Sequence, residues 1–173
     1  PTATPPSRGM SILYVEAGTP GLVIGRDLGK LGYRGTESCE VVLADARVPA
    51  EDLLGGQEGA GMKQALSVLE IGRINIAARA VGVAQAAYEA ALAYAQQRKA
   101  FGHPIADFQA VQLKIADMAT EIQAARLLTW WAADRVGSQA RADTESGMAK
   151  YFASEVALRA ALAAMRIHGA YGY

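Results

Sequence analysis

The run Arg98-Lys99-Ala100-Phe101-Gly102 places two cations and an aromatic ring where an Ala-rich helical pattern stops. A guanidinium such as that of Arg98 can form paired charge-assisted hydrogen bonds with a phosphate. The ring of Phe101 can line a flat aromatic group, so the run is a candidate site for a diphosphate joined to a ring system. A plainer explanation is open at this point, because cations at a helix C-terminus gain ~0.3–1 kcal/mol from the helix dipole.

A second candidate is the glycine-rich stretch Gly169-Ala170-Tyr171-Gly172-Tyr173, which follows the last helical pattern. Such a turn can expose several backbone N–H groups to an anion, although it can equally be a helix stop with a tail. Arg166 and His168 stand beside it. We interpret His168 as a capping or packing residue and predict no metal site, because only His103 accompanies it and no Cys or carboxylate cluster does.

Arg73 stands among Ile and Gly residues in the first helical pattern. A buried cation is costly unless it finds an anion, and Glu70, three residues earlier, is a candidate. An intrahelical ion pair and a role facing a ligand are both open. Further along, we expect Trp130-Trp131 to be packing anchors rather than a stacking platform. No Ser-His-Asp arrangement, Walker loop or GxGxxG stands out.

Apolar residues at helical spacing predict three long helices, over about 59–97, 108–135 and 144–168. Pro104 and its preceding residues separate the first two, and Gly169 caps the third. Three helices leave an apolar face uncovered, so we expect a fourth helix from missing sequence or from another subunit. The predicted apolar stripes are Met62, Leu66, Leu69, Ile76, Val83, Ala87 and Ala91; then Val111, Ile115, Met118, Ile122 and Leu128; then Met148, Phe152, Val156 and Leu162.

The N-terminal third has a different texture. Residues 1–8 are rich in Pro, Thr and Ser and predict an irregular entry. Residues 11–15 and 22–24 predict a hairpin, with further strands at 31–34 and 39–43. The predicted fold is therefore mainly α: an antiparallel long-helix bundle over 57–173, preceded by a small antiparallel β portion within 1–56.

Composition narrows the class of protein. The 173 residues hold 17 basic and 17 acidic side chains, a formal net charge of +0, so no overall field favours nucleic acid or an anionic membrane. The single Cys39 cannot form an internal disulfide, and no apolar stretch approaches membrane-spanning length. We expect a cytoplasmic protein without a membrane span or nucleic-acid partner. Because the chain begins at Pro1 and stops after a Gly-rich turn, we expect it to be a piece of a longer protein.

Taken in order, the motifs resemble the acyl-CoA dehydrogenase family, most closely its short-chain branch. Any one motif is weak, but their order and spacing are specific and span nearly the whole chain. The similar stretches are Lys30–Gly35, Asp45–Gly55, Gly72–Ile74, Arg98–Gly102, Phe108–Ala110, Ala116–Ala119 and Ile167–Tyr173.

The resemblance implies a three-part fold, of which this chain supplies the later part of the central β domain and most of a C-terminal four-helix bundle that assembles homo-oligomers, dimers or tetramers. It implies FAD as cofactor. Arg98 would reach an FAD diphosphate bound mainly by a neighbouring subunit, with Phe101 and Gln109 beside it and Gly169-Ala170 presenting backbone to the same cofactor.

Two positions depart from the family pattern. Arg166 stands where relatives usually carry Gln, and an added cation is compatible with a diphosphate. Ala170 replaces the usual second Gly, and its Cβ is expected to restrict a turn that needs a positive φ.

The reaction implied is α,β-dehydrogenation of an acyl-CoA, in which a carboxylate removes the α-proton and the β-hydrogen leaves as hydride to the flavin, with an electron-transfer flavoprotein as acceptor. Arg73 matches the arginine near the acyl-CoA, and Glu70 matches an acidic position close to the CoA portion. In most relatives the base lies beyond Tyr173; in a minority branch it matches Gly72. Glu70 cannot replace it, since residues two apart on a helix differ by about 200° in direction. No catalytic base is assigned.

Two alternatives stay open. One is a flavin oxidase or monooxygenase of the same architecture, which differs in how the reduced flavin meets oxygen. The other is a non-catalytic helical oligomerisation module, which the absence of the base and of half the flavin pocket favours for the isolated segment, although Arg98, Phe101 and Gln109 together argue against it for the complete protein.

Overall fold

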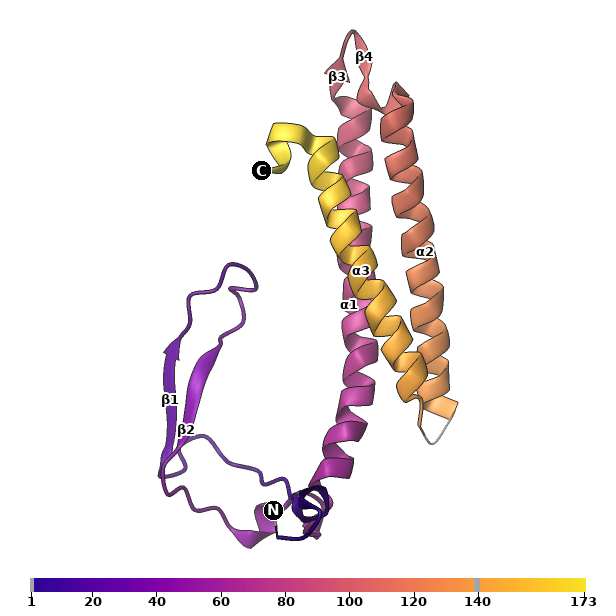
Figure 1. Cartoon of the computed structure of the whole chain (residues 1–173). Helices are drawn as coiled ribbons and strands as arrows, with labels where there is room; N and C mark the ends of the chain where they lie inside the picture. Colours follow the sequence, from indigo (N-terminus) through magenta and orange to yellow (C-terminus); the bar gives the residue numbers. More distant parts are fainter. Residues whose placement is uncertain (1, 139–140) are drawn as a thin grey trace. The chain divides into compact units, whose positions relative to one another are not determined.

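The computed structural model describes residues 2–138 and 141–173 and divides into two compact units, Pro1–Leu66 and Ser67–Tyr173. The first unit contains the antiparallel strands β1 (Leu22–Asp27) and β2 (Cys39–Leu43), which pair from Leu22↔Leu43 to Asp27↔Cys39. It also holds the 3-10 turns η1 (Pro6–Gly9), η2 (Ala50–Asp52) and η3 (Leu54–Gly56). The predicted small antiparallel β portion is thus confirmed (Figure 1).

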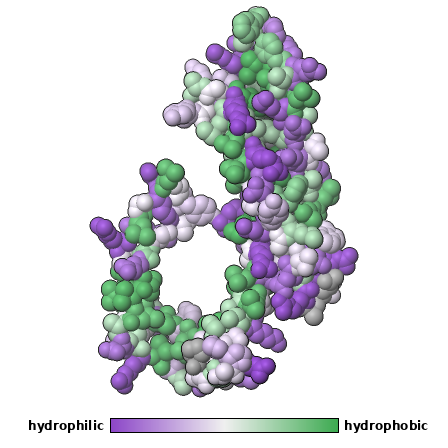
Figure 2. Space-filling view, viewed as in Figure 1, coloured by the Kyte–Doolittle hydropathy of each residue, from purple (hydrophilic) through white to green (hydrophobic). Residues whose placement is uncertain are grey.

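The strand partners differ from the predicted hairpin. Residues 11–15 do not pair with 22–24: Leu13 forms an isolated bridge with Leu53 instead, and the Tyr14 N–H donates to the Asp52 carbonyl at 2.9 Å. β-branched and aromatic residues signal an extended segment without specifying its partner, so the predicted pairing was wrong. Several β1 and β2 side chains, Val23, Ile24, Val41 and Leu43 among them, leave an exposed apolar surface (Figure 2).

Residues 31–34 form a turn rather than the predicted strand. Tyr33 has a φ of +59°, and the Lys30 ammonium ties the loop together through the Ser38 hydroxyl at 3.0 Å. Gly32 lies within the segment and Gly35 directly follows it, and such glycines favour turns over strands. At the entry, residues 2–5 are irregular, as predicted, and η1 adds one 3-10 turn; Pro1 lies outside the described residues.

The three predicted helices are confirmed within a few residues as α1 (Gly61–Gln97), α2 (Gln109–Ser138) and α3 (Asp143–His168). Between α1 and α2 lie the short strands β3 (Lys99–Ala100) and β4 (His103–Pro104) and the turn η4 (Ile105–Asp107); η5 (Gly169–Gly172) follows α3. Within the second unit successive helices run antiparallel, with α2 and α3 packed along each other (Figure 1).

Alanine dominates the bundle core. Small side chains let helix axes approach closely, which explains why this Ala-rich sequence packs with few large core residues. The buried set is Ala77, Ala84, Ala91 and Ala95 of α1, Met118, Ile122, Ala125 and Ala132 of α2, and Ala149, Ala153, Val156, Ala160, Ala164 and Ile167 of α3.

The predicted stripe of α2 is confirmed, whereas those of α1 and α3 were partly wrong. Leu66, Leu69, Ile76 and Val83 of α1 are exposed, although Ala91 of that stripe is buried. Met148 and Leu162 of α3 are exposed as well, whereas Val156 is buried. The spacing predicted the helices correctly, but not which face of α1 and α3 packs. In both helices alanines form most of the packed face, and the large side chains named above point outward. The expected uncovered apolar face therefore exists within the described residues.

Trp130 and Trp131 are not packing anchors of this chain. They are 62% and 41% exposed, and the Arg135 guanidinium carbon lies 6.0 Å from the Trp131 ring centroid. The buried residues of this stretch of α2 are Thr129 and Ala132, so both indoles fall largely outside the core face. None of the helices in the described ranges combines the length and apolarity that crossing a bilayer needs.

Candidate functional site

A two-residue hairpin loop carries the first candidate residues. Lys99 pairs with Pro104 and Ala100 with His103, which leaves Phe101 and Gly102 as the loop, with φ values of +53° and +92°. Two-residue hairpins favour positive φ at both loop positions, which suits Gly102. A non-glycine residue in this region costs about 1–3 kcal/mol. Phe101 is therefore held in a strained conformation.

The Phe101 ring projects from this strained turn and is 93% exposed. Its ring contact within the described residues is an edge-to-face one with Phe108, at 6.2 Å between centroids and an interplanar angle of 90°. The Phe108 ring also lies 4.7 Å from that of His103. An exposed aromatic ring on a constrained turn is available to a flat partner from outside the chain.

Arg98 has a fixed backbone and a free side chain. Its N–H donates to the Tyr94 carbonyl at 2.8 Å, and its own carbonyl accepts from the Ile105 N–H at 2.8 Å. Across the two described ranges, no hydrogen bond or ion pair occupies its exposed guanidinium. Gln109, also exposed, begins α2 at the same end of the bundle (Figure 1). A cation without an anion next to an exposed ring fits a phosphate-bearing aromatic ligand.

The glycine-rich turn lies at this end too. The His168 ring stacks on Tyr94 at 4.5 Å, and its Nδ1 lies 2.8 Å from the Ala164 carbonyl, so the predicted packing role is confirmed. Tyr171 approaches the same Tyr94 at 6.3 Å. Tyr94 lies one helical turn before Arg98. Its contacts with His168 and Tyr171 therefore bring the glycine-rich turn beside the hairpin end of α1.

Gly169 caps α3 as predicted, with a φ of +59° and its N–H donating to the Arg166 carbonyl. Ala170 has no positive φ; of the residues that the structure describes, only Tyr33, Asp45 and Phe101 are non-glycines with one. The expectation that a Cβ at Ala170 restricts a positive-φ turn was therefore wrong.

Arg166 lines a groove of about 500 Å³ between α2 and α3, together with Lys114 and Arg159. Arg159 is paired, its Nε lying 3.1 Å from Glu121 Oε2. Within the described parts of the chain, Lys114 and Arg166 have no such anion. Asp117 and Glu121 line the same groove, so its three cations exceed its two carboxylates by one, close to the glycine-rich turn.

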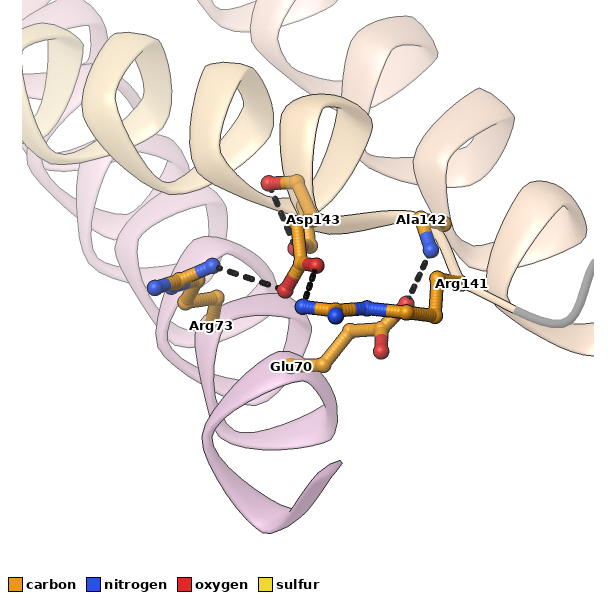
Figure 3. Close-up of polar contacts among 6 residues, drawn as sticks. Glu70, Arg73, Arg141, Ala142 and Asp143 are labelled. Carbon is orange, nitrogen blue, oxygen red and sulfur yellow. Dashed lines mark hydrogen bonds and ion pairs between the residues drawn. The ribbon is translucent and has the colours of Figure 1, made fainter. Parts of the chain in front are cut away.

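The remaining two candidates, Glu70 and Arg73, lie near the start of α3 (Figure 3). The Glu70 carboxylate is buried and accepts a hydrogen bond from the Ala142 N–H. Arg73 Nη1 lies 3.5 Å from Asp143 Oδ1, and Arg141 engages the other oxygen of that carboxylate. The intrahelical Glu70–Arg73 pair was wrong, because each residue finds its partner at the N-terminus of α3. Nor is Arg73 buried, since its side chain is 39% exposed.

The two groups of candidates occupy different ends of α1. From Arg73 to Gln97 the helix rises roughly 36 Å, at 1.5 Å per residue. One protomer therefore cannot present Arg73 and Arg98 to the same point on a ligand. Gly72, beside Arg73, faces open space, because a Cβ added there would meet nothing within 4 Å. No cluster of three or more His, Cys, Asp or Glu side chains fit to hold a metal ion occurs in the described residues.

Sequence reasoning missed two residues that organise these sites. Asp143 is visible in the sequence only as an acidic residue in the first turn of a predicted helix, a common helix-dipole preference. Tyr94, which gathers His168 and Tyr171, shows no signal beyond its place in an Ala-rich helix.

The fold defines a mainly α protein of long antiparallel helices that follow a small β sheet in the sequence. One end of the bundle carries cations that have no anionic partner among the residues described. The family model described as "Acyl-CoA dehydrogenase, C-terminal domain" matches residues 59–173. The chain therefore belongs to the acyl-CoA dehydrogenase family.

Similar proteins support this assignment. Probable acyl-CoA dehydrogenase YngJ of Bacillus subtilis is 50% identical, over 95% of this chain and 43% of its own length. Caffeyl-CoA reductase-Etf complex subunit CarC of Acetobacterium woodii is 40% identical, over 96% and 44%. The solved butyryl-CoA dehydrogenase of Megasphaera elsdenii superposes with a TM-score of 0.94 at 39% identity, over 99% and 44%. This chain spans less than half the length of each.

Proposed function

We propose that this chain is part of an FAD-dependent acyl-CoA dehydrogenase, which removes one hydrogen from each of the α and β carbons of an acyl-CoA thioester. The observation that carries the proposal is the hairpin end of the bundle, where Arg98, unpaired within the described residues, precedes the exposed Phe101 by three positions. A bundle that served only to assemble subunits would have no use for an exposed ring in a strained turn.

The residues at that end fit FAD in type. Arg98 would hold the diphosphate, Phe101 and Gln109 would line the cofactor, and the Gly169-Ala170 backbone would face it, with Arg166 as an added cation. When bound, FAD supplies the redox chemistry by accepting the hydride. Arg73 lies roughly 36 Å away along α1, which supports contact between Arg98 and a cofactor carried mainly by a second copy.

At the other end, we assign Arg73 to the acyl-CoA, because its guanidinium stays partly exposed while Asp143 holds it. The assignment of Glu70 to the CoA portion stays a prediction, and its carboxylate is already occupied by the Ala142 N–H. The base that takes the α-proton is not assigned to any residue of this chain.

The partners follow from the same family. The name of the Acetobacterium woodii relative places it in a complex with an Etf, which supports an electron-transfer flavoprotein as the acceptor here. The exposed apolar side chains of α1 and α3 support assembly into a homo-oligomer. A cytoplasmic location stays a prediction.

Arg98→Ala in the complete natural protein tests the proposal, with Lys99→Ala as the matched control on the next residue. Loss of the charge-assisted bonds weakens FAD binding by about tenfold or more, which lowers flavin absorbance per protomer while the molecular mass of the assembly is unchanged. Lys99→Ala retains FAD. Flavin content unchanged in Arg98→Ala would refute the role of Arg98.

The reaction class is tested by adding butyryl-CoA to the complete wild-type protein with FAD bound. The thioester bleaches the bound flavin, and electrons pass to an electron-transfer flavoprotein. Rapid reoxidation of the bleached flavin by dissolved oxygen would instead identify an oxidase of the same architecture.

A further inference from the structure

We propose that Asp143 is a positioning residue for Arg73: its carboxylate, held at the start of α3, directs the guanidinium that faces the acyl-CoA. The proposal rests on the proposed function, in which Arg73 contacts that substrate. Its starting observation is the 3.5 Å contact between Arg73 Nη1 and Asp143 Oδ1, which joins α1 to α3 (Figure 3).

The backbone that carries Asp143 is fixed from α1. The buried Glu70 carboxylate accepts the Ala142 N–H, and the Ala142 carbonyl accepts the first helical bond of α3 from the Ser146 N–H at 2.9 Å. Glu70 and Arg73 are three residues apart and so lie on one side of α1. Glu70 thereby sets where Asp143 stands, and Asp143 sets where Arg73 points.

The arrangement leaves Arg73 available. A guanidinium has five N–H donors, and the contact with Asp143 engages one of its nitrogens. Asp143 shares its carboxylate with Arg141, so it does not compensate the charge of Arg73 alone. The Arg73 side chain, 39% exposed, can therefore offer its remaining donors to an anionic or carbonyl oxygen of a thioester. Without Asp143, the same long side chain would sample several rotamers.

The test measures the dissociation constant of crotonyl-CoA, the unsaturated product of butyryl-CoA, by isothermal titration calorimetry on the complete FAD-loaded protein. Asp143→Asn raises this constant by about two- to fivefold, the effect of losing a partly exposed ion pair. Asp143→Glu keeps the charge and restores binding to within about twofold of the wild type. The matched control is Glu145→Gln, which removes a carboxylate from the same first turn and leaves the constant unchanged.

A double variant separates positioning from a merely structural role. If Asp143 acts through Arg73, Asp143→Asn has no further effect once Arg73→Ala is present. An equal effect of Asp143→Asn in both backgrounds would overturn the proposal. If Asp143→Asn loses its FAD, Asp143→Ser takes its place with the same expectations.

The failures are distinguishable. Arg73→Ala with wild-type binding would overturn the substrate role of Arg73, and with it that part of the proposed function. Weakened binding in Arg73→Ala together with wild-type binding in Asp143→Asn would overturn the positioning role alone.

Discussion

The helix α1 carries one arginine towards each end of the bundle, and the two have opposite surroundings. Arg73 lies 3.5 Å from the carboxylate of Asp143, beside the buried Glu70. Arg98 has no anion within residues 2–138 and 141–173. The charged groups at the first end contact partners within the chain and join α3 to α1, while Arg73 keeps donors free. Under the proposed function, the charge at the second end would be satisfied by the bound cofactor.

The backbone conformation also differs between the two ends of the bundle. At the start of α3, Ala142 has a φ of −136° and a ψ of 44°, outside the left-handed region. At the hairpin end, Phe101 has a φ of +53°. Strain of this kind persists where the surroundings impose it and is concentrated at functional sites. Under the proposed function, the Glu70 end would serve mainly stability and the Arg98 end mainly binding.

Removing Glu70 gives the largest expected loss of stability. Glu70→Ala leaves the buried Ala142 N–H without its charged acceptor and lowers the free energy of unfolding by about 1.5–3 kcal/mol. Thermal unfolding of the complete natural protein measures this, and amide exchange at Ala142 locates it. The control Glu89→Ala removes an exposed carboxylate of the same helix, which accepts a hydrogen bond from Gln85, and changes stability by less than about 0.5 kcal/mol. Equal effects of the two variants would remove the contrast between the ends.

Phe101→Asn separates stability from binding at the other end. Asn tolerates positive φ better than Phe, and the relief of strain outweighs the lost edge contact with Phe108, for a net gain of about 0.5–1 kcal/mol. FAD retention falls, because the exposed ring is gone. Thermal unfolding and flavin absorbance on one preparation report both effects. A variant that is less stable and yet retains its flavin would contradict the assignment on both counts.

The smallest effect is expected at Ala170, which has no positive φ. Ala170→Gly increases the entropy of the unfolded chain and lowers stability by about 0.4–1 kcal/mol, while FAD retention is unchanged. Tighter FAD binding in this variant would show that the bound turn needs the glycine that relatives carry.

Helix positions were predictable from sequence because periodicity and breakers are local signals. Pro104 and Gly169 each interrupt the pattern close to where a helix ends or begins. The face that packs was not predictable in α1, since its leucines and its alanines both recur at helical spacing. Only the close approach of the helices, which alanine permits, decides that Ala84 is buried and Val83 is exposed.

In the candidate site too, features local in sequence were predictable and contacts made by tertiary packing were not. Arg98 and Phe101 were visible from residue type and from the resemblance, because they are neighbours in sequence. The strain at Phe101 was not, since a two-residue hairpin inside a break between helices leaves no periodic pattern. The Arg73–Asp143 pair joins residues 70 positions apart, and local reasoning favoured the nearer Glu70. Contacts made by tertiary packing lie beyond a pattern read along the chain.

The most direct test is a structure of the complete natural protein with FAD bound, in which the distance from the Arg98 guanidinium to the diphosphate is measured. We predict a hydrogen-bonding separation of about 3 Å, to a cofactor carried mainly by a second copy of the protein. A guanidinium directed into solvent, or paired with a carboxylate elsewhere in the assembly, would contradict the account.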